Sequence, residues 1–231
     1  MKNLWKWEKI NRKKSFIKPN TSSTTIISSS DGPTAVFLSN GKHKPNIKQR
    51  IQKKLFELRK KWHALWIKPN PHTMEEVAVY IQKKYGFKRL PKKSKKYQRL
   101  YNELRSSFIM QYEPQLLGEY AVLPELKSEN EADVKEFLEQ IQLRQKKAEE
   151  VPEELFSLDY YCFEGKTKGA HMEIQLESRF GYIGGGVSGK FISKYHKIYK
   201  DVYKYYGVSK EDIANNSKRY QNLLRQLAIR H

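Results

Sequence analysis

The sequence has few of the features that mark membrane-spanning, disulfide-bonded or disordered chains. Cys162 is the only cysteine in 231 residues, which excludes a disulfide scaffold and favours a reducing, cytoplasmic location. Cys162 lies in an apolar segment, so we expect it to be buried. No run of about 18 apolar residues occurs, so no segment is expected to cross a membrane. Aromatic residues make up 13% of the chain, which is too many for a wholly disordered protein.

Acidic residues are also scarce: the chain has 25 Asp or Glu residues and 45 Lys or Arg residues, which gives a formal net charge of +20. The excess is concentrated at one end. Residues 1–100 carry 26 basic and 5 acidic residues, whereas residues 101–154 carry 6 basic and 13 acidic ones. A concentrated positive block attracts polyanions, namely nucleic acid, an anionic membrane surface or an acidic protein. The acidic middle segment is able to neutralise part of that block.

The patterning predicts an α+β fold that is mostly helical, with a helical region followed by a β-hairpin and two C-terminal helices. We expect a flexible, basic and Ser/Thr-rich N-terminus with a short strand over residues 1–41, a helical domain over 42–150, and a small hairpin-plus-two-helix module over 151–231. The predicted helices cover residues 46–67, 73–85, 96–112, 129–149, 191–206 and 210–229. The predicted hairpin strands cover 158–163 and 171–176, with a turn over 164–169 between them.

The helix predicted over residues 46–67 is basic and amphipathic. Its apolar residues recur at steps of three and four, which places them on one face: Ile47, Ile51, Leu55, Leu58, Trp62, Leu65 and Trp66. We expect this face to pack into the core. Two alternatives remain open: the helix lies on an anionic membrane with its tryptophans at the interface, or it directs its cations at phosphates.

Nucleic-acid binding through phosphate contacts, without catalysis, is the function that the charge pattern favours. The alternatives are an enzyme acting on a phosphate-bearing substrate and a module that binds a membrane surface or another protein. The predicted nucleic-acid-binding residues lie in the helix at 46–67 and in the lysine-rich loop that follows the next helix: Lys53, Lys54, Arg59, Lys60, Lys61, Lys92, Lys93, Lys95 and Lys96.

A glycine cluster near the C-terminal end fits the pattern G-x-x-x-x-G-K, which is typical of loops that hold phosphate with backbone amides. The predicted phosphate-binding residues are Gly184, Gly185, Gly186, Gly189 and Lys190. Phe191 stands where a magnesium-binding Ser or Thr would follow, which argues against nucleotide hydrolysis. An enzyme using this loop would need a nearby acid or base, for which His171, Glu173 and Glu177 are candidates. The histidines show no metal-ligand spacing, and no cofactor is indicated.

The segment Asp31-Gly32-Pro33-Thr34, followed by an apolar run within residues 26–40, resembles a signature of the beta subunit of biotin-dependent sodium-pumping decarboxylases. In that family the aspartate lies within the membrane near the ion path. Here serines replace the preceding Gly-Gly-Ala and no membrane-spanning run exists, so the resemblance does not imply sodium transport. The same segment, together with residues 70–77, also resembles small soluble proteins of Firmicutes.

Overall fold

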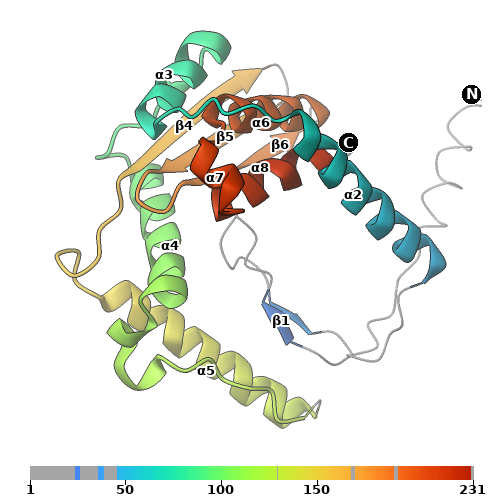
Figure 1. Cartoon of the computed structure of the whole chain (residues 1–231). Coiled ribbons are helices and arrows are strands. Elements are labelled where there is room, and N and C mark those ends of the chain that lie inside the picture. The colour runs from blue at the N-terminus through green and yellow to red at the C-terminus, as the bar shows by residue number, and fades with distance from the viewer. Residues whose placement is uncertain are drawn as a thin grey trace, which may run out of the picture.

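The computed structural model describes residues 24–26, 36–38, 46–128, 130–167, 170–189 and 192–229. It is an α+β structure that is mostly helical, as predicted (Figure 1). Its elements, in chain order and with the labels of Figure 1, are β1 Thr24–Ile26, β2 Val36–Leu38, α2 Ile47–Trp66, α3 Met74–Tyr85, β3 Lys88–Arg89, α4 Lys95–Tyr112, the 3-10 helix η1 Pro114–Tyr120, α5 Glu131–Glu150, β4 Tyr160–Thr167, β5 Ala170–Glu177, β6 Tyr182–Gly189, α6 Ile192–Tyr206, α7 Lys210–Ala214 and α8 Lys218–Ala228.

An antiparallel sheet with the strand order β3-β4-β5-β6 lies at the centre of the molecule (Figure 1). The register pairs Phe163 with Ile174 and Cys162 with Gln175. Because side chains alternate between the two faces of a strand, Phe163 and Ile174 share one face, and Cys162 lies on the other. The hairpin predicted from alternating hydrophobicity is therefore confirmed, and both of its strands are longer than expected.

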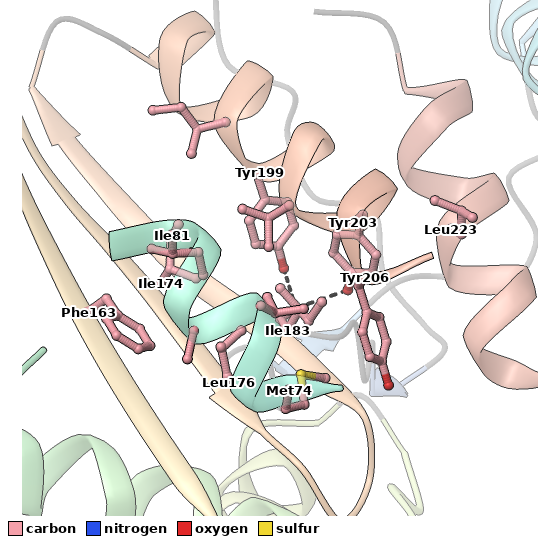
Figure 2. Packing of buried hydrophobic residues seen from close by; sticks show 14 of the residues in the cluster. Met74, Ile81, Phe163, Ile174, Leu176, Ile183, Tyr199, Tyr203, Tyr206 and Leu223 are labelled. Carbon is pink, nitrogen blue, oxygen red and sulfur yellow. Dashed lines mark hydrogen bonds between the residues drawn. The ribbon is translucent and has the colours of Figure 1, made fainter. Parts of the chain in front are cut away.

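The first face of the sheet holds the larger part of the core, beneath α3, α6 and α8 (Figure 2). Ile81 from α3 and Ile183 from β6 are among its fully buried side chains. The hydroxyl groups of Tyr199 and Tyr203 on α6 both donate hydrogen bonds to the carbonyl oxygen of Ile183. This core contains residues of α3, which precedes residue 150, and of β4, β5, β6, α6 and α8, which follow it. The predicted regions 42–150 and 151–231 therefore share one core.

The second face of the sheet packs against α4 and the segment that follows α5. Tyr97 on α4 donates a hydrogen bond of 2.9 Å to the carbonyl oxygen of Tyr160 on β4. Cys162 is buried in the same cluster, as predicted from its apolar segment. Burial raises the pKa of its thiol to about 12, so the thiol stays protonated at neutral pH.

The helix predicted over residues 210–229 is interrupted in the structure. It consists of α7 and α8, separated at Asn216, which has a φ of 48°. Ser217 caps α8 by accepting a hydrogen bond from the amide of Tyr220. The start of α5 also differs from the prediction, since the helix begins at Glu131, after its N-cap Asn130, rather than at residue 129.

The glycine cluster expected to form a phosphate-binding loop is a strand instead. Gly184, Gly185, Gly186 and Gly189 all belong to β6, which pairs with β5 along its whole length. The predicted turn over 164–169 is also shorter than expected, because β4 continues to Thr167. Within the expected N-terminal region of residues 1–41, the prediction of a short strand is confirmed by Val36–Leu38, which pairs with Thr24–Ile26. The rest of that region, including Asp31-Gly32-Pro33-Thr34, lies outside the described residues.

Candidate nucleic-acid interface

The helix α2 forms as predicted, but it buries a different face. Asn46 and Gln49 close a capping box at its start, and Pro69 follows its end. The apolar stripe that we expected in the core is exposed, with 45% to 76% of each residue accessible: Ile47, Ile51, Leu55, Leu58, Trp62, Leu65 and Trp66. We call these seven residues the exposed stripe.

The contact between α2 and the body is made by the opposite side of the helix. Phe56, His63 and Ala64 are half-buried there, at positions roughly 115° to 145° around the helix from the centre of the exposed stripe. The neighbour is the C-terminal end of α8, and Arg59 donates a hydrogen bond of 3.4 Å to the Ala228 carbonyl oxygen. The last carbonyl groups of a helix lack partners within it and carry partial negative charge, which explains why a cation lies here.

Four basic side chains meet where α2, α6 and α8 come together, and we call them the junction cluster: Arg59, His63, Lys200 and Lys204. Burial, together with the charges of Lys204 and Arg59, lowers the pKa of Lys200. Burial, together with the charges of Lys200 and Lys204, lowers the pKa of His63. Within the described part of the chain, Arg59, Lys200 and Lys204 form no ion pair. The fold therefore gathers like charges for which the described residues supply no carboxylate, and the partners of Arg59 and Lys200 are carbonyl oxygens of α8.

Sequence reasoning found only one member of the junction cluster, Arg59. The lysines of α6 are interleaved with tyrosines, and a helical pattern does not show which of them faces another helix. Lys200 donates a hydrogen bond of 2.7 Å to the carbonyl oxygen of Leu227, a contact between residues 27 positions apart in the chain. Only the packing of α2 and α6 on α8 brings these cations together.

The other predicted cations of α2 have different surroundings. Lys53, Lys54 and Lys61 are exposed, and none of them forms an ion pair with a described residue. Lys53 lines a shallow depression with Phe56 and Arg59, next to the junction cluster. Lys60 is half-buried and lies 3.5 Å from the carboxylate of Glu57.

The second predicted basic stretch lies apart from the first. Lys92, Lys93 and Lys95 are exposed at the start of α4, on the opposite side of the molecule from α2 in Figure 1. Lys96 is the exception in this set. Its ammonium group lies 2.5 Å from Glu164 and 2.9 Å from Glu173, and it holds the pKa of Glu164 below its usual range. Lys96 therefore already has two acidic partners.

The pair of glutamates bound by Lys96 sits on neighbouring strands of the second sheet face. Glu164 and Glu173 are directly opposite each other in the register of β4 and β5. His171 Nε2 lies 3.2 Å from Glu164, so two of the candidate acid or base residues, His171 and Glu173, belong to this cluster. The third candidate, Glu177, is buried at the other end of β5, where its carboxylate accepts hydrogen bonds from backbone amides, including that of Phe180 at 2.7 Å.

The predicted phosphate site does not form a cradle of the kind that the glycine pattern suggests. The glycines of β6 lie in a paired strand, where successive amides point in opposite directions and do not converge on one point. Lys190 lies outside the described residues. The glycines of the G-x-x-x-x-G-K pattern thus belong to a strand and not to a loop.

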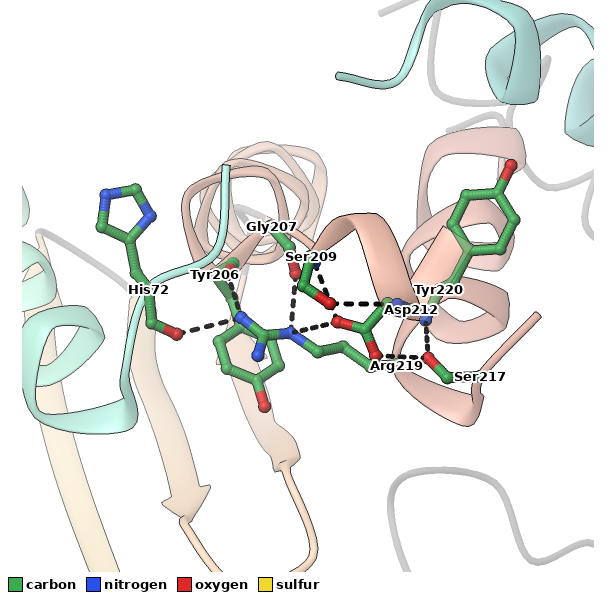
Figure 3. Close-up of polar contacts among 8 residues, drawn as sticks. All are labelled: His72, Tyr206, Gly207, Ser209, Asp212, Ser217, Arg219 and Tyr220. Carbon is green, nitrogen blue, oxygen red and sulfur yellow. Dashed lines mark hydrogen bonds and ion pairs between the residues drawn. The ribbon is translucent and has the colours of Figure 1, made fainter. Parts of the chain in front are cut away.

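Arg219 of α8, whose side chain reaches the turn between α6 and α7, shows how another cation stabilises the fold (Figure 3). Arg219 donates hydrogen bonds to the carbonyl oxygens of Gly207, His72 and Tyr206, and it lies 3.9 Å from Asp212. This network joins α8 to the C-terminal end of α6 and to the segment before α3. In contrast to the junction cluster, it includes a carboxylate.

Comparisons with protein-family models, with curated proteins and with solved structures found no match for this chain. Across the residues that the structure describes, no group of three or more His, Cys, Asp or Glu side chains is arranged to hold a metal ion. None of the described helices is long and apolar enough to cross a membrane.

Proposed function

We propose that this protein binds nucleic acid through phosphate contacts and that the junction cluster is the centre of the binding surface. The observation that carries this proposal is the meeting of Arg59, His63, Lys200 and Lys204 without an acidic partner among the described residues. Cations without an acidic partner raise the local positive potential, and a phosphate backbone relieves the repulsion among them.

The shape of the surrounding surface suits an extended polyanion better than a small anion. Lys53 adjoins the junction cluster, and Lys54 and Lys61 continue the charge along the exposed part of α2. A helix of 20 residues is about 30 Å long, comparable to about nine base pairs of duplex. Lys92, Lys93 and Lys95 form a separate basic group, so we expect them to add affinity but not to define the primary surface.

The direct test removes three cations at this surface. We expect the triple variant Lys53→Ala, Arg59→Ala, Lys204→Ala to bind DNA or RNA fragments on the order of 10- to 100-fold more weakly at low salt. The slope of log affinity against log salt concentration should also become shallower, by an amount that corresponds to the loss of up to about three phosphate contacts. Lys53 and Lys204 are exposed, so the fold should tolerate the change. Fluorescence anisotropy against salt concentration measures both quantities.

The matched control removes the same charge elsewhere. Lys83, Lys146 and Lys210 are exposed, and the triple Lys83→Ala, Lys146→Ala, Lys210→Ala should keep nearly all of the affinity. Equal weakening by both triples would show that net charge alone drives the binding and would refute the assignment to the junction. Absence of binding by the wild-type protein at about 50 mM salt would refute the function itself.

His63 supplies an independent, pH-dependent readout. Its pKa in the free protein is expected below 6.5, because burial and the two neighbouring lysines disfavour the charged ring. Because the folded chain holds this proton less readily than the unfolded chain, His63 reduces stability as the pH falls below 6.5. A bound phosphate chain should raise this pKa, so affinity should increase as the pH falls from about 7 to about 5.5.

Proton NMR titration of the His63 ring, with and without an oligonucleotide, measures this shift. The His63→Gln variant assigns the resonance and should remove the pH dependence that this ring contributes. An unchanged His63 pKa in the presence of saturating oligonucleotide would place the bound phosphates away from the junction cluster.

A further inference from the structure

Among the residues that the structure describes, nothing covers the exposed stripe, which is an apolar face about 30 Å long on the side of α2 that faces away from α8. We infer that this face docks α2 onto an anionic lipid surface, with the helix lying parallel to the membrane plane. This is a second binding activity, because the exposed stripe and His63 of the junction cluster lie on different sides of the helix, with Arg59 at the border between them.

The charge on α2 is complementary to an anionic surface. The helix has seven Lys or Arg residues and a single acidic residue, Glu57. Helical spacing places Arg50, Lys54 and Lys61 along one border of the exposed stripe. A helix in which leucine, isoleucine and tryptophan form one face and lysines flank it is the arrangement that binds in the interface plane of anionic membranes.

Two tryptophans mark the C-terminal end of the exposed stripe. Trp62 and Trp66 have ring centroids 6.1 Å apart, and both rings are largely exposed. Tryptophan prefers the boundary between lipid headgroups and acyl chains, because its ring is apolar and its N–H group is a hydrogen-bond donor. The aliphatic remainder of the stripe offers neither hydrogen bonds nor stacking surfaces to nucleic acid.

A second copy of this chain is a poorer occupant. Pairing two such stripes would bring together two helices that each carry a large excess of positive charge. An anionic lipid surface instead supplies acyl chains and negative charge at once.

The geometry allows docking without unfolding. Residues 47–55 of α2 are all exposed, and in Figure 1 this end of the helix projects away from the sheet and the helices that cover it. The contact with α8 uses the other face and lies toward the second half of α2, near Arg59 and Ala64. A membrane can therefore approach the stripe while α2 stays attached to α8.

The test measures binding of the full chain to vesicles by sedimentation. The probe is phosphatidylcholine with about 30% phosphatidylglycerol, compared with phosphatidylcholine alone. We expect binding to the anionic vesicles only, and a loss of about tenfold or more in the variant Ile51→Ser, Leu55→Ser, Leu58→Ser, which leaves every charge in place. The matched control Val122→Ser, Leu143→Ser, Leu155→Ser changes three exposed apolar residues elsewhere and should bind like the wild type.

Tryptophan emission locates the contact. In a Trp5→Phe, Trp7→Phe background only Trp62 and Trp66 emit, and their emission should shift to the blue on anionic vesicles. The inference is overturned if the wild type does not sediment with the vesicles, if the stripe variant binds as the wild type does, or if the emission does not shift. It is also overturned if the wild type is a dimer that the stripe variant dissociates, since a second copy would then cover the face.

Discussion

Gly185→Ala is expected to lower the free energy of unfolding by about 3 to 5 kcal/mol, a large share of the total stability of a typical protein. Two effects add. Gly185 has a φ of 141°, a backbone conformation that residues with a side chain rarely adopt. A methyl group there would also lie 2.0 Å from the carbonyl oxygen of Glu173, which belongs to the paired strand and has no freedom to move aside. Urea denaturation of the purified variant measures the loss.

Gly186 is the matched control in the same strand. A methyl group at Gly186 meets nothing within 4 Å, so Gly186→Ala should change the stability by about 0.5 kcal/mol or less. The pair also separates two explanations of the glycine cluster. If the glycines serve strand pairing, only Gly185→Ala lowers the free energy of unfolding strongly. If Gly186→Ala instead abolishes binding of phosphate or nucleic acid without affecting stability, the glycines bind a ligand.

Arg105→Ala is expected to cost about 3 kcal/mol of stability, through the loss of three hydrogen bonds in a buried setting. The Arg105 side chain donates to the carbonyl oxygens of Phe156 at 2.6 Å, and of Val151 and Pro152 at 2.7 Å each. These acceptors lie in the segment that joins α5 to β4, so Arg105 ties that segment to α4. Removing the guanidinium leaves the three carbonyl groups without these donors.

The control for Arg105 is on the same helix. Arg99 is exposed and lies 3.6 Å from Glu103, so Arg99→Ala should alter the stability by about 0.5 kcal/mol or less. Arg105→Lys keeps the charge but lacks the planar group that reaches several carbonyls, and it should fall between wild type and Arg105→Ala. Thermal unfolding of the three variants ranks them, and a stability of Arg105→Ala close to that of Arg99→Ala would contradict the assigned role.

The sequence predicts the positions of the helices well, because capping residues and apolar periodicity are local signals. Thr73 and Glu76 form a capping box at the start of α3, and Gly86 ends α3 in the left-handed conformation. The same periodicity does not predict whether the apolar face of a helix is covered by another element. In α2 the apolar stripe is as regular as in α3, yet only α3 buries its stripe, because the position of a neighbouring element is a tertiary property.

Two other differences from the sequence prediction have separate physical causes. The break between α7 and α8 carries a local signal, since Ser217 is a good N-cap, but a continuous helical pattern on both sides of it masks that signal. Strand β6 has almost no local signal, because glycine disfavours strands. Its structure depends on β5, which supplies the pairing partner, and on Tyr182, whose ring lies over Gly184.

The hydroxyl groups of Tyr199 and Tyr203 have a consequence for how this protein meets other molecules. Strand β6 is the last strand of the sheet, and a glycine-rich outer strand is a natural template for adding a strand from another chain. The Ile183 carbonyl in that strand already accepts two hydrogen bonds from the tyrosines, so it has no free capacity for an incoming backbone. At the opposite edge, β3 is two residues long and consists of Lys88 and Arg89, whose charges oppose the same kind of addition. Both edges therefore resist strand-to-strand aggregation, and partners are expected to approach through the helices.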